Sequence, residues 1–213
     1  MIYAYKQECI SEVMDNLGCM LDYAVYSMGF EANRFLNMFI ISGLAQEIEH
    51  ANPKYTVGMS GIELAHEVLY ITFGTEIEVK QYYTLDKSPE YWGMWSLAYY
   101  QFESELSFGR LLEYVTFDIA LQLYPTLHEA DISKFVDVLD TRIELYRKNT
   151  ETTVARLRRM QGYSQKVLAE QSGVSLRMIQ LYEQRQNDIN KAQAETLLKL
   201  AKALHCSMEE LMV

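Results

Sequence analysis

Residues that interrupt helices are scarce in this sequence. Of its 213 residues, 3 are proline and 10 are glycine, and runs in which apolar and polar residues alternate, as strands require, are few. Because proline and glycine disfavour the interior of a helix, their scarcity predicts long helices and an all-α fold. The sequence also has no run of about 18 apolar residues, so it predicts no membrane-spanning helix.

Cysteine is scarce as well. The three cysteines, Cys9, Cys19 and Cys206, form no CxxC pair and leave an odd thiol, which is typical of a reduced, cytoplasmic protein. Cys9 and Cys19 stand among apolar residues, so we expect both in the core. The N-terminal stretch lacks the basic region and the apolar core of a secretory signal, which also favours a cytoplasmic location.

Sequence motifs of catalysis are missing. The four histidines are scattered without HExxH spacing, and there is neither a GxSxG sequence nor a glycine-rich phosphate loop. We therefore expect no metal, no cofactor and no enzymatic activity.

Positive charge is scarce overall, but it is unevenly distributed. Residues 1–150 carry 10 Lys and Arg against 22 Asp and Glu, a net charge of −12, whereas residues 151–213 carry 9 against 7, a net charge of +2. This asymmetry predicts two modules. We expect an acidic helical domain over residues 1–149, which binds a partner, and a second domain over residues 150–213 with the basic patch of a nucleic-acid-binding protein.

The last 62 residues predict five short helices. A side chain that can accept a hydrogen bond from the backbone precedes each apolar-periodic stretch. In chain order, the expected N-caps are Thr152 or Thr153, Ser164, Ser175, Asn190 (with Gln193 three residues on) and Ser207 (with Glu210).

The second and third of these helices have the pattern of a helix-turn-helix. Such a motif needs a small residue where its helices cross, a glycine in the turn and an apolar anchor in the second helix. Ala169, Gly173 and Ile179 meet these needs at spacings of four and six, and Val174 would fill the crevice between the helices.

The stretch SQKVLAEQSGVSLRMIQLYEQ, followed by TLLKLAKALHCSMEELM, resembles the Cro/phage-repressor (XRE-type) helix-turn-helix domain over about residues 152–213. The resemblance implies a five-helix domain that binds double-stranded DNA in a transcriptional regulator. Gln184-Arg185-Gln186 departs from the family, which usually has a glycine after the glutamate. Since such domains usually bind two half-sites about one helical turn apart, a homodimer on a palindromic operator is implied.

The resemblance also implies which side chains contact DNA. They are Gln165, Lys166, Ser175, Leu176, Arg177, Gln180, Leu181, Arg185, Asn187 and Lys191. Arg177 is the best base reader, because a guanidinium can pair with O6 and N7 of guanine, and Gln180 could reach adenine. Leu176 and Leu181 could contact only a thymine methyl group or pack. Gln165, Lys166, Arg185, Asn187 and Lys191 match positions that hold phosphates.

Three further arginines, Arg156, Arg158 and Arg159, cluster in the first of the five helices. A contact with phosphate and a solvated helix face explain this cluster equally well.

In the first 149 residues the periodicity predicts helices over 7–28, 31–50, 60–73, 88–104, 107–124 and 130–149. A capping box of Ser60 with Glu63 and the pair Ser88-Pro89 mark two of the N-termini. Residues 72–90 lack a helical period, so we expect a loop or a short hairpin there.

Aromatic residues are concentrated between positions 82 and 102, a stretch that begins with Tyr82 and Tyr83 and ends with Phe102. One helical face carries Trp92, Trp95, Tyr99 and Phe102. This favours core packing, although tryptophan and tyrosine also dominate protein-binding hot spots. Tyr91 and Tyr100 lie off that face, so we expect them to be exposed. The candidate partner-binding residues are Tyr91, Trp92, Trp95 and Tyr100.

The sequence is compatible with three functions. The chain could be a repressor with a protein-binding N-terminal domain, or a regulator that senses a small molecule. It could also be an antitoxin, whose acidic domain neutralises a basic toxin while the C-terminal domain represses its own operon. A fourth alternative, an enzyme with a DNA-targeting tail, is disfavoured because the sequence shows no catalytic motif.

Overall fold

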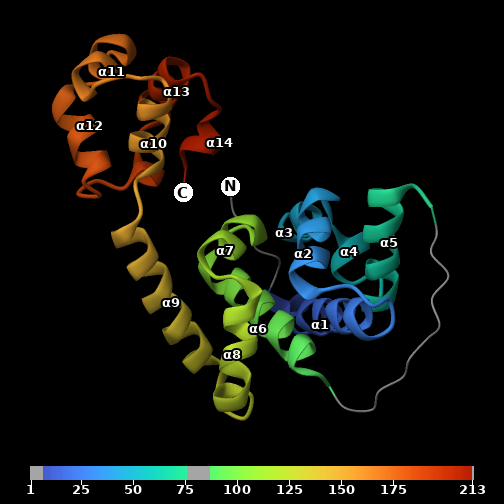
Figure 1. Cartoon of the computed structure of the whole chain (residues 1–213). Helices are drawn as coiled ribbons and strands as arrows, with labels where there is room; N and C mark the ends of the chain where they lie inside the picture. Colours follow the sequence, from blue (N-terminus) through green and yellow to red (C-terminus); the bar gives the residue numbers. More distant parts are fainter. Residues whose placement is uncertain (1–6, 76–86, 213) are drawn as a thin grey trace. The chain divides into compact units, whose positions relative to one another are not determined.

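The computed structural model describes residues 7–75 and 87–212, and within these ranges all regular structure is helical (Figure 1). The predicted all-α class is confirmed for this part of the chain. None of the described helices is long and apolar enough to cross a membrane. The chain divides by its contacts into two compact units, Met1–Ile143 and Glu144–Val213, so this boundary falls inside a helix, whereas the predicted domain limits lie just after it.

The first unit is a bundle of helices around α1. Its elements are the 3-10 turn η1 (Gln7–Cys9), α1 (Ile10–Tyr26), α2 (Ala32–Ile41), α3 (Leu44–Glu49), α4 (Pro53–Thr56), α5 (Gly61–Phe73), α6 (Pro89–Ser104), α7 (Phe108–Tyr114), α8 (Phe117–Leu127) and most of α9 (Ile132–Asn149). The capping box predicted at Ser60 and Glu63 is present at the start of α5.

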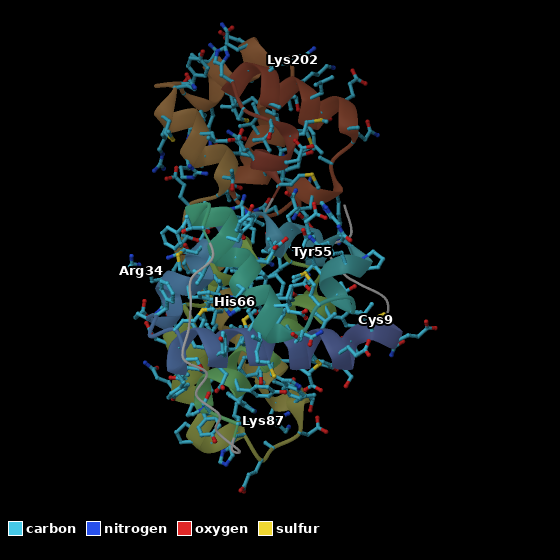
Figure 2. All side chains as sticks on the ribbon, turned by 90° about the vertical axis from the view of Figure 1, so that its right-hand side faces the viewer. Cys9, Arg34, Tyr55, His66, Lys87 and Lys202 are labelled. Atoms are coloured by element: carbon cyan, nitrogen blue, oxygen red, sulfur yellow. The ribbon has the colours of Figure 1, made fainter. Side chains whose placement is uncertain are left out.

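Small residues let α5 and α6 pack closely on α1. A Cβ atom at Gly61 would lie 2.4 Å from the carbonyl oxygen of Asn16, and one at Gly18 would lie 2.9 Å from the Tyr91 ring. The α1–α5 contact also includes a polar pair, since Tyr23 Oη lies 3.2 Å from Nε2 of His66. His66, on α5, is labelled in Figure 2. The helix α1 is therefore the central element of this unit.

Two of the predicted helices are interrupted. The helix expected over 31–50 ends at Ile41 and restarts as α3 after Gly43, which has a left-handed φ of 83°. The helix expected over 107–124 is divided into α7 and α8 by the extended residues Val115 and Thr116. Buried apolar residues stand on both sides of each break, Phe39 and Leu44 at the first and Leu111 and Phe117 at the second, so the apolar period does not reveal the breaks. Within the segment expected to be a loop or hairpin, residues 76–86, including Tyr82 and Tyr83, lie outside the described residues.

The predicted exposure of two tyrosines is wrong. Tyr91 is 5% exposed and Tyr100 2% exposed. Their hydroxyl groups donate to carboxylates on neighbouring helices, Tyr91 to Asp15 of α1 and Tyr100 to Asp140 of α9, both at 2.6 Å. Because α6 packs against both α1 and α8, it is buried on more than one face.

The tryptophans of α6 are half-buried. The ring of Trp92 packs edge-on against Tyr124 and Phe135, at centroid distances of 5.6 and 5.5 Å. This packing favours the core role over the hot-spot role for Trp92. The predicted burial of Cys19 is wrong, because Cys19 is exposed on the α1 face that also carries Asp15 and Asp22.

The second unit contains the end of α9 followed by α10 (Thr153–Met160), α11 (Gln165–Ser172), α12 (Leu176–Glu183), the 3-10 turn η2 (Ile189–Lys191), α13 (Ala194–Leu204) and α14 (Met208–Leu211). The predicted N-caps Thr152, Ser164, Ser175 and Ser207 are confirmed, each accepting a backbone N–H. The cap predicted at Asn190 is wrong. Asn190 lies within η2, whose N-cap is Asp188, and α13 begins only after Gln193.

Candidate nucleic-acid interface

The helices α11 and α12 form a helix-turn-helix around Gly173. Gly173 adopts a left-handed φ of 68°, and its N–H donates to the carbonyl of Ala169 at 2.9 Å. Ser172 secures the turn, because its hydroxyl donates to Leu168 O at 2.6 Å and accepts from the N–H of Val174 at 3.2 Å. The turn therefore has the backbone geometry that the glycine predicts.

The inner faces of both helices enter one apolar core. Leu168, Val174, Ile179 and Tyr182 are buried there, and Ala169 packs against them. The core continues into α13 and α14 through Leu197, Leu200, Ala201, Leu204 and Leu211. These contacts bury one side of α12, at Ile179 and Tyr182, and its other side carries the exposed residues Leu176 and Arg177.

The residues predicted to contact DNA lie at the start of α11, along α12 and in the segment from α12 to η2. Seven of them are exposed, namely Lys166, Ser175, Leu176, Arg177, Arg185, Asn187 and Lys191, and three are half-buried, namely Gln165, Gln180 and Leu181. Leu176 is 38% exposed although it is a large apolar residue. An exposed leucine beside Arg177 suits a surface that meets both apolar and hydrogen-bonding groups.

A buried ion pair holds the end of α12 against α10. Arg158 donates through Nε and Nη2 to the two carboxylate oxygens of Glu183, at 2.6 and 3.0 Å, and through Nη1 to Tyr163 O at 2.6 Å. The side chains of the pair are only 11% and 7% exposed. Arg158 is therefore neither a phosphate contact nor a solvated charge, and both hypotheses for it are wrong.

The same carboxylate also orients the first residue of α11. Gln165 Nε2 donates to Glu183 at 2.8 Å. This hydrogen bond fixes the side chain that is predicted to contact a phosphate. Burial opposes the ionisation of Glu183, but the hydrogen bonds from Arg158 and Gln165 outweigh it and lower the pKa of Glu183 below its ordinary value. Glu183 thus stays charged and links three helices.

Comparison with known proteins agrees with this geometry. Residues 154–211 match a family model described as Helix-turn-helix. They are an XRE-type helix-turn-helix domain. A domain of this type is the DNA-binding part of a transcription regulator. No curated protein and no solved structure matches the chain.

The departure from the family sequence, Gln184-Arg185-Gln186, lies at the C-terminal end of α12. The helix α12 ends in a Schellman motif. The N–H of Gln186 donates to Leu181 O at 2.9 Å, and the N–H of Arg185 donates to Tyr182 O at 3.2 Å. Arg185 occupies the left-handed position with a φ of 55°. The family's glycine suits such a position, so here an arginine adopts a conformation that costs an L residue about 1–2 kcal/mol.

Arg156 and Arg159, the other two arginines of α10, are exposed. Arg159 pairs with Glu151 at 3.1 Å, and Arg156 lies 3.9 Å from the sulfur of Met160. Reasoning from the sequence missed Glu183, because nothing local marks a partner 25 residues from Arg158. The one available signal was its place at the end of the recognition helix.

Proposed function

We propose that this chain is a sequence-specific transcriptional regulator, acting as a repressor, whose DNA-binding domain comprises residues 150–213. The observation that carries the proposal is the outer face of α12. Arg177 and Leu176 are exposed there, whereas Ile179 is fully buried on the inner face. A helix anchored in this way from one side can lie in the major groove with its N-terminal residues against the base edges.

Each outer side chain of α12 suits one kind of base contact. The guanidinium of Arg177 would donate two hydrogen bonds to a guanine, and Gln180 would pair with an adenine one turn further on. Leu176 and Leu181 would contact thymine methyl groups. The phosphates would be held at the edges of this face, by Gln165, Lys166, Arg185, Asn187 and Lys191.

The test is a selection of operators from random duplexes with the full-length protein, followed by two variants. Arg177→Ala should weaken binding of the selected operator by about 1–3 kcal/mol and relax the preference at one base pair. Lys191→Ala should weaken all duplexes alike and reduce the salt dependence. An unchanged base preference in Arg177→Ala would remove Arg177 from base recognition.

The same proposal includes a homodimer. A palindromic operator with half-sites about one helical turn apart would match two copies of α12. Sedimentation of the full-length protein, with and without operator DNA, measures the stoichiometry. A protein that stays monomeric in both conditions, or a selected operator without two-fold symmetry, would contradict the dimer.

For residues 1–149 we propose a protein-binding role. The net charge of −12 over residues 1–150 would repel DNA and steer a basic protein into contact. The first unit also exposes three large apolar side chains near the end of α5, Tyr70, Ile71 and Phe73, which could anchor such a partner. If the partner is a basic toxin, the chain is its antitoxin and represses their shared operon.

Capture with the full-length protein as bait in its source cell separates these roles. Recovery of a basic protein encoded beside it, whose toxicity the chain suppresses, would establish the antitoxin. Recovery of only a second copy of the chain would leave dimerisation as the role of residues 1–149.

A further inference from the structure

The first unit contains a pocket of about 300 Å³ between α2 and the segment that runs from α7 to the start of α8. Its apolar lining consists of Leu36 of α2, Leu112 of α7 and Phe117 of α8. Leu36 and Phe117 also belong to the core of the unit, with exposed fractions of 1% and 0%. Because core residues line the pocket, the packing of three helices fixes its shape.

The polar lining of the pocket consists of Asn33, Asn37, Thr116 and Asp118. Asn33 Nδ2 donates to Oδ1 of Asp118 and to Oε1 of Glu31, both at 3.1 Å. These two bonds use both N–H groups of the Asn33 amide, so its oxygen remains as an acceptor. They also link α2 to the start of α8 and hold the side chains of Asn33 and Asp118 together.

Hydrogen-bonding capacity remains on the other polar groups of the pocket. Within residues 7–75 and 87–212, the side chains of Asn37 and Thr116 form no hydrogen bond, although Thr116 stands at the N-cap of α8. Over the same residues, Asp118 accepts only the bond from Asn33 and pairs with no lysine or arginine. The pocket thus offers a ligand a carboxylate, two amide oxygens and a hydroxyl oxygen.

The charge around this pocket is negative. The carboxylates of Glu31 and Asp118 are joined through Asn33, and neither has a cationic partner in the described part of the chain. Arg34, the neighbour of Asn33 on α2, pairs with neither of them there. The N-terminus of α8 carries about half of an elementary positive charge, which offsets only part of the full charge on Asp118. A cation is therefore favoured over an anion.

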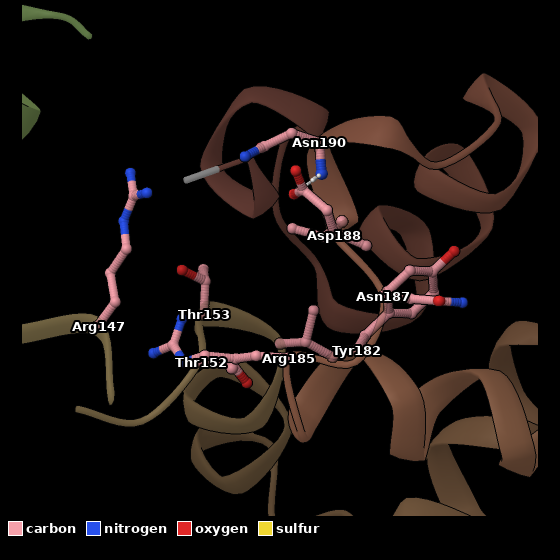
Figure 3. A pocket seen from close by; sticks show the side chains of 10 residues that line it. Arg147, Thr152, Thr153, Tyr182, Arg185, Asn187, Asp188 and Asn190 are labelled. Atoms are coloured by element: carbon pink, nitrogen blue, oxygen red, sulfur yellow. Dashed lines mark hydrogen bonds between the residues drawn. The ribbon is translucent and has the colours of Figure 1, made fainter. Parts of the chain in front are cut away.

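A pocket of the second unit has the opposite formal charge. It lies beside the start of α10, and the charged residues in its lining are Arg147, Arg185 and Asp188 (Figure 3). Positive side chains outnumber the negative one there. Among the described residues that line the pocket of the first unit, Asp118 alone is charged. The two pockets therefore suit ligands of different charge.

A guanidinium group matches the lining of the first unit's pocket. Its five N–H donors form a planar fork that can pair with both oxygens of a carboxylate and still reach further acceptors, whereas an ammonium has only three donors. The apolar stem of an arginine can lie on apolar surface while its charged end stays at the polar edge. We propose that this pocket binds a guanidinium group, with Asp118 as the counter-ion.

An arginine side chain of a basic protein partner is the source that the pocket favours, an inference that rests on the role proposed for residues 1–149. Sites for free small molecules bury about 70–90% of the ligand surface, but here Asn37, Thr116 and Asp118 are all exposed. A single side chain that is held by the rest of its protein does not need such enclosure. The net charge of −12 over residues 1–150 steers basic proteins toward this unit. A free guanidinium compound is the other source of the same chemistry.

The first experiment titrates the full-length protein with N-acetylarginine amide and, in parallel, with N-acetylcitrulline amide, which has a similar shape but a neutral urea group. The backbone amide signals of residues 33–37 and 112–118 are followed by NMR. The arginine compound should shift these signals to saturation, and the citrulline compound should not.

Two variants with the same chemical change identify the counter-ion. Asp118→Asn retains an oxygen that can accept from Asn33, and it should weaken binding of the arginine compound by about tenfold. Asp137→Asn removes the same charge from an exposed position of α9 in the same unit that does not line the pocket. It should leave this binding unchanged.

The two sources are distinguished with a purified basic protein that the full-length chain captures. If its affinity also falls about tenfold in Asp118→Asn but not in Asp137→Asn, the pocket holds an arginine of that protein. An unchanged affinity for the protein, with the arginine compound still bound, would assign the pocket to a free guanidinium compound.

Equal responses to the arginine and citrulline compounds, or no response to either, would refute the proposed site. Because this comparison uses the wild-type chain and needs no partner, it remains decisive even if Asp118→Asn unfolds. Failure of the proposed protein-binding role would show differently, since no basic protein would be captured while the arginine compound still bound.

Discussion

The buried carboxyl group of Glu49 should make the first unit lose stability as the pH rises. Glu49 lies on α3, is 3% exposed and accepts the backbone N–H of Phe108, the first residue of α7, at 2.6 Å. Burial raises the pKa of this carboxyl from 4.5 to about 7, because the hydrogen bond from Phe108 offsets only part of the cost of burying the charge.

The sign of the effect follows from the proton that the folded state retains. Below pH 4.5 the carboxyl is protonated in both the folded and the unfolded chain, and its contribution to stability is fully present. Between the ordinary value and about 7 only the folded chain stays protonated, so the free energy of unfolding falls as the pH rises and then levels off. The shift corresponds to a loss of about 3 kcal/mol above pH 7.

Glu49→Gln should abolish this loss, since the amide oxygen can still accept from Phe108 but cannot ionise. We expect wild type and variant to be similar near pH 4.5, and the variant to be more stable by about 3 kcal/mol at pH 8. Both tryptophans of the chain, Trp92 and Trp95, lie in the first unit, so urea unfolding followed by their fluorescence measures this unit. Glu47→Gln, an exposed position on the same helix, is the control.

A difference between wild type and Glu49→Gln that is the same at pH 4.5 and pH 8 would refute the reasoning. It would mean that the carboxyl ionises near its ordinary pKa, either because water reaches it or because the local structure opens at little cost.

Further predictions concern the helix-turn-helix domain. Replacing one member of the buried pair, as in Arg158→Ala or Glu183→Ala, should destabilise the domain by about 3–5 kcal/mol, because the other charge is left buried without a partner. Thermal unfolding measures this cost. A cost below about 1 kcal/mol, as for an exposed pair, would show that the pair is not buried in solution. Arg185→Gly should stabilise the domain by about 1 kcal/mol by relieving the left-handed backbone while weakening DNA binding. A loss of stability in Arg185→Gly would show that the hydrogen bond to Thr150 outweighs the backbone strain.

Local sequence determined most of the helix-turn-helix. The caps at Ser164 and Ser175 and the left-handed turn at Gly173 depend on residues within a few positions of one another, so a short stretch specifies them. The same holds for the burial of Val174 and Ile179, because the crossing of the two helices leaves few places for apolar side chains. The exposed surface of α12 follows from that burial.

The tertiary structure decided the contacts between residues that lie far apart in the sequence. Tyr91 and Tyr100 lie off the aromatic face of α6, but their burial depends on α1 and α9 supplying Asp15 and Asp140 as acceptors. Periodicity orders the faces of one helix and cannot tell how many of them another helix will cover.

The charged side chains show the same division. The cluster of arginines in α10 is visible in the sequence, yet only the folded chain brings Glu183 against Arg158 and leaves Arg156 exposed. A charge is tolerated inside the domain only where a partner replaces the water it loses. The packing of α12 on α10 supplies that partner. The residues of either helix alone do not determine this packing.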